Sequence, residues 1–411
     1  MQIDAVDAFS LLTARAVRER AHRMLTIGLD KRLPHFLIDL RSLDAAVDLV
    51  LRTIRDRYRT LDIPFHARWR HFVIRGKDRW AAIADATRWP DRDARARAEF
   101  DLAIISVLLD AGAGPTWHYH DRLTGAHIGR SEGLALASLD MFASGLFSTR
   151  ADEPLRVDAE ALARLSVGGL RGGLQVSDDN PLVGLEGRVD LLRRLGTQVA
   201  AVPRIFARQD SPRPGGLFDH LATRSDRGII TAPAILTELL LEFGPIWPGR
   251  IILGGTGLGD CWRHPTLATD DATSGLVPLH KLSQWLAYSL IEPIDRAGLQ
   301  VSDIDELTGL AEYRNGGLFV DTGVLALRDP ADAERVHDIG STLVVEWRAL
   351  TVALLDRLAD ALRARVGRNA TTLPLARILE GGTWAAGRAI AHAHRVDGAP
   401  PIKVISDGTV F

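Results

Sequence analysis

The sequence predicts a mainly α-helical protein, built as one large domain with few short strands. Apolar residues recur at three- to four-residue spacing through most of the chain, which is the period of an amphipathic helix. Alternating runs rich in β-branched residues, which are typical of strands, are rare. No fixed-period repeat and no clear linker divides the 411 residues. We therefore expect a single helical domain over residues 1–411, with the more irregular residues 1–130 as a possible N-terminal subdomain.

The helical pattern is spread over the whole chain. In residues 5–24, Phe9, Leu12 and Ala16 would share one face, and residues 131–147 are apolar enough to predict a buried helix. The expected helices cover residues 5–24, 44–59, 93–111, 131–147, 158–165, 186–195, 232–243, 276–294, 331–365 and 374–393. Near the C-terminus, only residues 402–411 (IKVISDGTVF) favour a strand and a turn.

The composition is that of an ordinary globular protein, with 46% hydrophobic and 25% charged residues. The formal charge of −2 gives no field that would attract a nucleic-acid polymer. Cys261 is the single cysteine, which excludes internal disulfides and thiolate zinc cages. No run reaches the roughly 18 apolar residues of a membrane helix, and residues 1–14 do not have the pattern of a signal peptide. We therefore expect a cytoplasmic protein without a membrane partner.

The stretch from residue 305 to 325, DELTGLAEYRNGGLFVDTGVL, gathers polar side chains beside glycines. Its pattern predicts a helix that begins near Asp305 and ends at Gly316–Gly317, with the polar run EYRN (residues 312–315) at its C-terminal end. Two glycines there would let the backbone approach a ligand closely. The alternative is an ordinary helix end with solvated side chains, and the residues alone leave both open.

A second concentration of polar residues lies upstream. His280, Lys281 and Gln284 fall within the mostly apolar residues 276–294. Apolar neighbours surround them, so Lys281 must extend its ammonium group to solvent, pair with an anion or take part in chemistry. The glycine-rich residues 254–259 (GGTGLG) superficially resemble a dinucleotide loop, but no convincing parallel strand and long helix flank them.

A metal site is a competing hypothesis. Asp260 and His264 are four residues apart and would share one face of a helix, with Glu312 as a third ligand. Pro265 limits such a helix to about one turn. Zinc is therefore a possible cofactor, and no cofactor is certain.

Other runs carry weaker signals. Residues 64–75 (PFHARWRHFVIR) are either an anion-binding wall or an aromatic-anchored loop. The H-x-H-D run at 118–121 has metal-ligand spacing but is better interpreted as a short strand. Glu132, at the start of the 131–147 helix, is either a first-turn cap or a substrate contact. Arg213 precedes a glycine-led helix start that could seat a phosphate.

Two motifs carry a resemblance to known proteins. H-K-x-x-Q at 280–284, followed by L-T-x-x-A-E-Y-R at 307–314, resembles the queuosine-phosphate N-glycosylases, which are relatives of the helix-hairpin-helix DNA glycosylases. Over essentially the whole chain, the sequence is similar to a family of unknown-function proteins tied to uracil catabolism in fungi and bacteria. The matching stretches are PFHARWRHF, SEGLALASLDMF, RPGGLFDHL, LGDCWRHP, AEYRNGGLFVDTGVL and SDGTVF.

The resemblance implies a DNA-glycosylase-like helical core and a step in uracil breakdown through a ribosylated intermediate that releases urea. An N-glycosidic bond of ribosylurea phosphate or of a uracil nucleotide would be hydrolysed. The acidic residue of A-D-Y-R is functional in the glycosylases, and Glu312, a longer carboxylate, takes its place here. Such cleavage passes through an oxocarbenium-like state, which a nearby carboxylate stabilises.

The candidate residues follow from that chemistry. Glu312 is the expected catalytic carboxylate, with Asp260 in reserve, and Trp285 could stack on a planar base. The expected substrate contacts are Lys281, Gln284, Arg314, Asn315, Trp262, Tyr313, Glu132 and Asp321. The alternatives are a uracil- or nucleotide-binding protein without catalysis and a zinc-dependent amide or ring hydrolase. The expected partner is a small molecule; the sequence names neither the exact substrate nor the oligomeric state.

Overall fold

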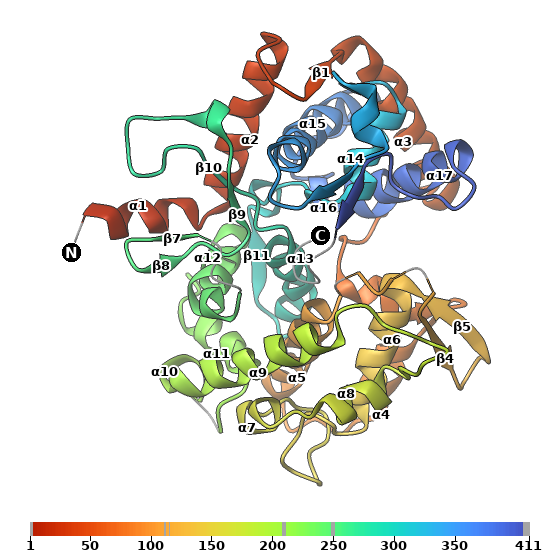
Figure 1. The fold of residues 1–411 in the computed structure, drawn as a ribbon. Helices are drawn as coiled ribbons and strands as arrows, with labels where there is room; N and C mark the ends of the chain where they lie inside the picture. The colour runs from red at the N-terminus through yellow and green to blue at the C-terminus, as the bar shows by residue number, and fades with distance from the viewer. Residues whose placement is uncertain (1–2, 111, 115, 208–210, 248–250, 406–411) are drawn as a thin grey trace.

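The computed structural model describes residues 3–110, 112–114, 116–207, 211–247 and 251–405. Across these residues the protein is mainly helical, as the sequence predicts (Figure 1). The α-helices are α1 Ile3–Leu11, α2 Ala14–Leu29, α3 Leu43–Arg57, α4 Arg79–Ala86, α5 Arg92–Leu108, α6 Arg130–Ala143, α7 Ala159–Ala163, α8 Val167–Gly173, α9 Leu185–Ala201, α10 Pro203–Phe206, α11 Gly216–Thr223, α12 Ala232–Glu242, α13 Lys281–Arg296, α14 Tyr313–Asp321, α15 Thr342–Val366, α16 Leu375–Ile378 and α17 Trp384–His394.

The strands are two to four residues long and pair two by two. The antiparallel pairs are β1 Phe36–Ile38 with β12 Leu325–Leu327, β2 Val73–Ile74 with β3 Lys77–Asp78, β4 His118–Asp121 with β5 Ala126–Gly129, β7 Ile252–Leu253 with β8 Thr256–Gly257, and β9 Cys261–Arg263 with β10 Leu276–Pro278. The parallel pairs are β6 Ile229–Thr231 with β11 Gln300–Ser302, and β13 Val336–Asp338 with β14 Lys403–Ile405.

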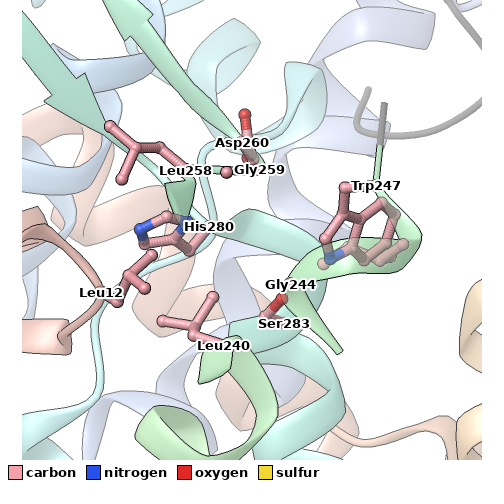
Figure 2. A pocket seen from close by; sticks show the side chains of 11 residues that line it. Leu12, Leu240, Gly244, Trp247, Leu258, Gly259, Asp260, His280 and Ser283 are labelled. Carbon is pink, nitrogen blue, oxygen red and sulfur yellow. The ribbon is translucent and has the colours of Figure 1, made fainter. Parts of the chain in front are cut away.

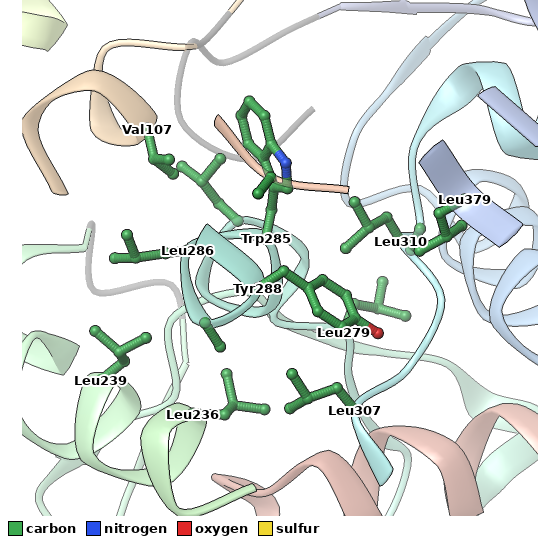
Figure 3. Packing of buried hydrophobic residues seen from close by; sticks show 14 of the residues in the cluster. Val107, Leu236, Leu239, Leu279, Trp285, Leu286, Tyr288, Leu307, Leu310 and Leu379 are labelled. Atoms are coloured by element: carbon green, nitrogen blue, oxygen red, sulfur yellow. The ribbon is translucent and has the colours of Figure 1, made fainter. Parts of the chain in front are cut away.

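Helix α13 lies near the middle of the molecule, between a group of helices that contains α4–α11 and one that contains α2, α3 and α14–α17 (Figure 1). It packs against α5 on one side and α12 on another. Leucines from several elements surround it, among them Leu236, Leu307 and Leu310, while Trp285 and Tyr288 leave it in different directions (Figure 3). The core therefore closes around the helix that carries Lys281 and Gln284.

Local capping explains several helix starts. Thr13 breaks the helix predicted over residues 5–24, because its hydroxyl accepts a hydrogen bond from Ala16 N (3.1 Å) and caps α2. The helix predicted over 331–365 begins only at α15, where Ser341 caps Val344 N. None of the helices in the described ranges is both long and apolar enough to span a membrane.

The structure also shows the secondary structure of three short sequence motifs. The H-x-H-D run is strand β4, with His118 and His120 exposed, which confirms the strand interpretation. The glycine-rich run forms the turn between β7 and β8, where Gly254 and Gly255 have φ of 53° and 81°. Strand β14 begins the predicted C-terminal strand and turn, and residues 406–411 (SDGTVF) lie outside the described residues.

Candidate active site

Helix α14 begins at the EYRN run, so the prediction that a helix ends there is wrong. Glu312 is the N-cap of α14: its carboxylate accepts hydrogen bonds from Arg314 N (2.8 Å) and Asn315 N (2.6 Å). The two glycines lie inside the helix and allow close packing. A Cβ added to Gly316 would lie 2.7 Å from the Trp347 side chain on α15. Glu312 is thus held in one orientation by backbone N–H groups.

The start of α13 is fixed by a carboxylate from elsewhere in the chain. Asp260 accepts a hydrogen bond from Lys281 N (3.0 Å) and a bidentate ion pair from Arg348 on α15 (2.8 and 2.9 Å). Arg348 also donates to the carbonyl of Ala311 (3.1 Å), next to Glu312. Burial opposes ionisation of Asp260, but the guanidinium of Arg348 outweighs it and holds the pKa of the carboxyl well below its usual range. The pair positions the two helix starts beside each other.

Lys281 places its half-buried side chain among these carboxylates. It forms no ion pair within 4.0 Å with any described residue. Burial lowers the pKa of its ammonium group, while the nearby Glu312 and Asp110 carboxylates act in the opposite direction. Lys281 is therefore a basic side chain without a committed partner, close to the expected catalytic carboxylate.

A second wall comes from the PFHARWRHF run, which forms a 3-10 helix over Arg68–Phe72. Arg68 is fully buried; it pairs with Asp110 (3.0 Å) and donates to Ser106 (2.6 Å). Burial, and then the charge of Arg68, lower the pKa of His71 to about 4, so its imidazole is neutral at physiological pH. The run is thus part of the site.

A third wall is aromatic and cationic. The guanidinium of Arg314 lies over the rings of Tyr313 (5.3 Å) and Trp384 (4.8 Å). Arg314 is 5% exposed and has no carboxylate within ion-pair distance among the described residues. Arg388 lies over the same Trp384 ring (5.9 Å) and pairs with Glu132 (3.4 Å). Arg314 is therefore a second uncommitted cation at the site.

The polypeptide reaches Trp384 through a π-helical turn, Leu379–Thr383, inserted between α16 and α17. Within this turn, Glu380 binds His66 of the PFHARWRHF run (2.9 Å). Gly387 on α17 faces the backbone of Arg314, since a Cβ there would lie 2.3 Å from the Arg314 carbonyl oxygen. The π turn and this close approach hold α17 against α14.

The structure thus brings together many of the predicted site residues. Glu312, Lys281, Arg314, Asn315, Tyr313 and Glu132 fall in the cluster just described. Sequence reasoning missed Asp110, which follows α5 without a motif of its own. It also gave Trp384 no place in the site.

Other predicted residues have structural partners. Both ends of the Gln284 amide bind Thr308, and Trp262 donates to Asp260 (2.7 Å). Asp321 ends α14 and forms a bidentate pair with Arg395 (2.9 and 2.6 Å), roughly 12 Å along the helix from Tyr313. Asp321 thus lies at the opposite end of α14 from Glu312, and Gln284 and Trp262 bind neighbouring side chains of the protein, so the substrate contacts of these three residues stay predictions.

The predicted metal geometry is wrong, because Asp260 and His264 flank a strand, β9, rather than share a helix face. The oxygens of Asp260 are bound by Arg348, whereas Nε2 of His264 faces Glu346 at 3.4 Å. Within the described ranges, no three histidine, cysteine or acidic side chains gather as a potential metal site.

Two of the cavities among the described residues bear on the predicted sites. A recess of about 10 Å³ beside Asp260, Trp247 and His280 has room for about one water molecule (Figure 2). A cavity of about 570 Å³ is lined by Trp89, Phe206 and several arginines. Among these, Arg213 binds Asp101, which also accepts a hydrogen bond from Gly215 N (2.5 Å). The phosphate seat predicted at Arg213 is therefore filled by the protein's own carboxylate.

Comparison with known proteins identifies the family to which this chain belongs. The model of the family described as "Protein of unknown function (DUF1688)" matches residues 10–411. The chain belongs to this family. Two relatives match the DUF1688 chain over nearly its whole length. "Protein urg3" of Schizosaccharomyces pombe is 39% identical over 98% of each chain, and "Uracil catabolism protein 4" of Lachancea kluyveri is 37% identical over 92% of each. The family match covers every segment that contributes to the site.

Proposed function

We propose that this DUF1688 protein is an enzyme of uracil catabolism that hydrolyses the N-glycosidic bond of ribosylurea phosphate or of a uracil nucleotide. The observation that supports this most is the meeting of Glu312 with two uncommitted cations, Lys281 and Arg314, at adjoining helix starts. The similarity to "Uracil catabolism protein 4", which is 37% identical, supports the pathway. The carboxylate suits a developing oxocarbenium ion, and the cations suit a phosphate.

The chemistry assigned to Glu312 is compatible with its role as a helix cap. Each carboxylate oxygen accepts one backbone hydrogen bond and keeps further acceptor capacity. The backbone bonds fix the carboxylate, so that its charge can face the anomeric carbon or a water molecule without reorganisation. In the proposed reaction, a water oxygen bonds to the anomeric carbon as the bond to nitrogen breaks. One proton of the water ends on the departing nitrogen, which gives ribose phosphate and urea or uracil.

Arg314 is the proposed phosphate-binding residue. A buried guanidinium without an anion is costly, and aromatic faces compensate only part of the lost hydration. A phosphate would complete its coordination, with Lys281 available as a second cation.

A binding protein without catalysis is the second candidate. It is favoured by the cap formed by Glu312, because a carboxylate with a structural task need not be retained for turnover. The zinc-dependent alternative has no comparable support, since the described residues offer no cluster of metal-ligating side chains.

The test is incubation of the purified protein with ribosylurea 5-phosphate, UMP, uridine and uracil, with products identified by mass spectrometry. We expect ribose 5-phosphate to appear together with urea or uracil, and one oxygen from ¹⁸O-labelled water to appear in the sugar. Intact substrates accompanied by a raised melting temperature would favour the binding protein. A ring-opened product with its glycosidic bond intact would contradict the N-glycosidase assignment.

A further inference from the structure

Within the part of the chain that the structure describes, the buried polar atoms without a hydrogen-bond partner include three that lie close together beside the candidate site: Nη2 of Arg68, Nδ1 of His71 and Nε1 of Trp285. Arg68 is fully buried and Trp285 is 5% exposed. Leaving such a group unpaired costs about 1–3 kcal/mol, so buried polar groups in folded proteins almost always have partners. Three unpaired groups close together therefore call for an explanation.

The three side chains form one wall. The guanidinium carbon of Arg68 lies 5.4 Å from the Trp285 ring centre, and the His71 ring meets Trp285 edge-on at 5.6 Å. Trp285 leaves α13 one turn after Lys281, while Arg68 and His71 come from the neighbouring 3-10 helix. His71 also meets Trp384, at 6.5 Å, which joins this wall to the ring beneath Arg314.

The wall is electrically balanced. The charge of Arg68 is already paired with Asp110, and the His71 imidazole is neutral at physiological pH. Its free hydrogen-bonding groups therefore suit a neutral oxygen rather than an anion. Beside them, Oδ1 of Asp110 lies 3.0 Å from Nη1 of Arg68 but receives no well-aligned hydrogen bond. Donors and an acceptor side by side on an aromatic face are complementary to a planar amide.

We propose that Arg68, His71 and Trp285 form the subsite for the planar ureide of the substrate, the N–C(=O)–N unit that urea derivatives and uracil share. Its carbonyl oxygen accepts hydrogen bonds from Arg68 Nη2 and Trp285 Nε1, and its N–H groups donate to Asp110 Oδ1 and to His71 Nδ1. This assignment rests on the proposed function. It identifies the residues that would bind the leaving group of the reaction. Glu312 and Lys281 then face the sugar.

Binding of two fragments tests the subsite, because neither contains the bond to be cleaved. Uracil carries the ureide without a sugar, and ribose 5-phosphate carries the sugar without a ureide. Trp285→Phe keeps the ring and removes the N–H. In calorimetric titrations of the full chain, we expect this variant to bind uracil about 5- to 20-fold more weakly, as for the loss of one buried hydrogen bond. Its affinity for ribose 5-phosphate should not change.

Trp89→Phe is the matched control, since Trp89 donates to Ala84 O (2.8 Å) and lines the separate cavity of about 570 Å³. It should leave both affinities unchanged. His71→Phe keeps the ring contact, removes the nitrogens and should repeat the selective loss, which guards against misfolding of the first variant. Equal losses for both fragments, unchanged uracil affinity in Trp285→Phe, or no uracil binding by the wild type would each overturn the subsite. Selective uracil binding without any cleavage would instead refute the N-glycosidase and leave the subsite standing.

Discussion

Glu312 combines a local structural role with the proposed chemical one, and the two can be separated by measurement. Glu312→Gln keeps the shape and removes the charge. We expect turnover per folded molecule to fall by about 10²-fold or more, because positioned acid–base groups typically contribute 10²–10⁴-fold. The same change weakens the cap of α14, so the free energy of unfolding should also fall by about 1 kcal/mol.

Asp91→Ala provides the control for that experiment. Asp91 caps α5 through Ala94 N (2.6 Å), at the end of that helix opposite Asp110, and its loss should cost similar stability with unchanged turnover. Near-normal turnover in Glu312→Gln would end the catalytic assignment and leave a purely structural residue.

His71 gives the site a pH signature. Its pKa is about 4 in the folded protein and about 6.5 in the unfolded chain, so the unfolded state binds an extra proton between these values. The stability that comes from burying this histidine in its neutral form is therefore fully present above pH 6.5 and is lost as pH falls toward 4. The free energy of unfolding should fall by about 3 kcal/mol at most over this range. Denaturant titrations at pH 5, 6 and 7 should show a smaller loss of stability in His71→Phe. If the wild type and His71→Phe lost the same stability as pH falls, the lowered pKa of His71 would be refuted. The charged and titratable groups around His71 are Arg68, Asp110, Glu132 and His66.

A motif or a resemblance singled out Glu312, Lys281 and Arg314, which the structure places at adjoining helix starts. Asp110 could not be singled out, because a lone aspartate after a helix carries no pattern that distinguishes it from a solvated one. Its role depends on Arg68, 42 residues earlier, and on Ser131, which donates to it (2.8 Å). Only the packed fold brings these three together.

At the scale of elements, the helices were predictable from their apolar period, whereas two decisive boundaries were not. Helix α13 begins at Lys281 because His280 adopts a left-handed conformation (φ 46°) and Asp260, 21 residues away, caps the new helix. Helix α14 begins at Tyr313 because Glu312, an uncommon capping residue, bends back onto its own helix. Both starts depend on capping side chains, which the spacing of apolar residues does not reveal.

The contact between α14 and α17 makes a prediction about helix packing. Gly387→Ala would place a Cβ against the carbonyl oxygen of Arg314, which is backbone and cannot rotate away. We expect a loss of about 1–3 kcal/mol in the free energy of unfolding, measured by denaturant titration, and weaker binding of ribose 5-phosphate as α17 moves.

Gly187→Ala is the matched change in α9, where an added Cβ meets nothing within 4 Å. It should raise stability by up to about 1 kcal/mol, because alanine favours a helix interior more than glycine does. If the two substitutions changed the free energy of unfolding equally, the close approach of Gly387 to the Arg314 carbonyl oxygen would not affect stability.

At the scale of the whole molecule, the first 130 residues are packed into the rest. Helix α2 lies against α15, and α5 lies against α13. We therefore expect residues 1–130, expressed alone, to remain unfolded by far-UV circular dichroism, and the full chain to unfold in one transition followed equally by circular dichroism and fluorescence. A cooperative melt of the fragment would establish the N-terminal subdomain instead.

The π turn at Leu379–Thr383 has a consequence for how this site could have arisen. An α-helix advances by about 100° per residue, so one residue more or fewer in that turn rotates everything after it by about that angle. Removal of a single codon there would swing Trp384 and Arg388 off the face of Arg314 and leave α17 helical. One inserted codon is thus enough to aim an existing helix at a new target, and its loss would also turn Gly387 away from the Arg314 carbonyl oxygen, so that the ligand wall and the packing of α17 would be lost together.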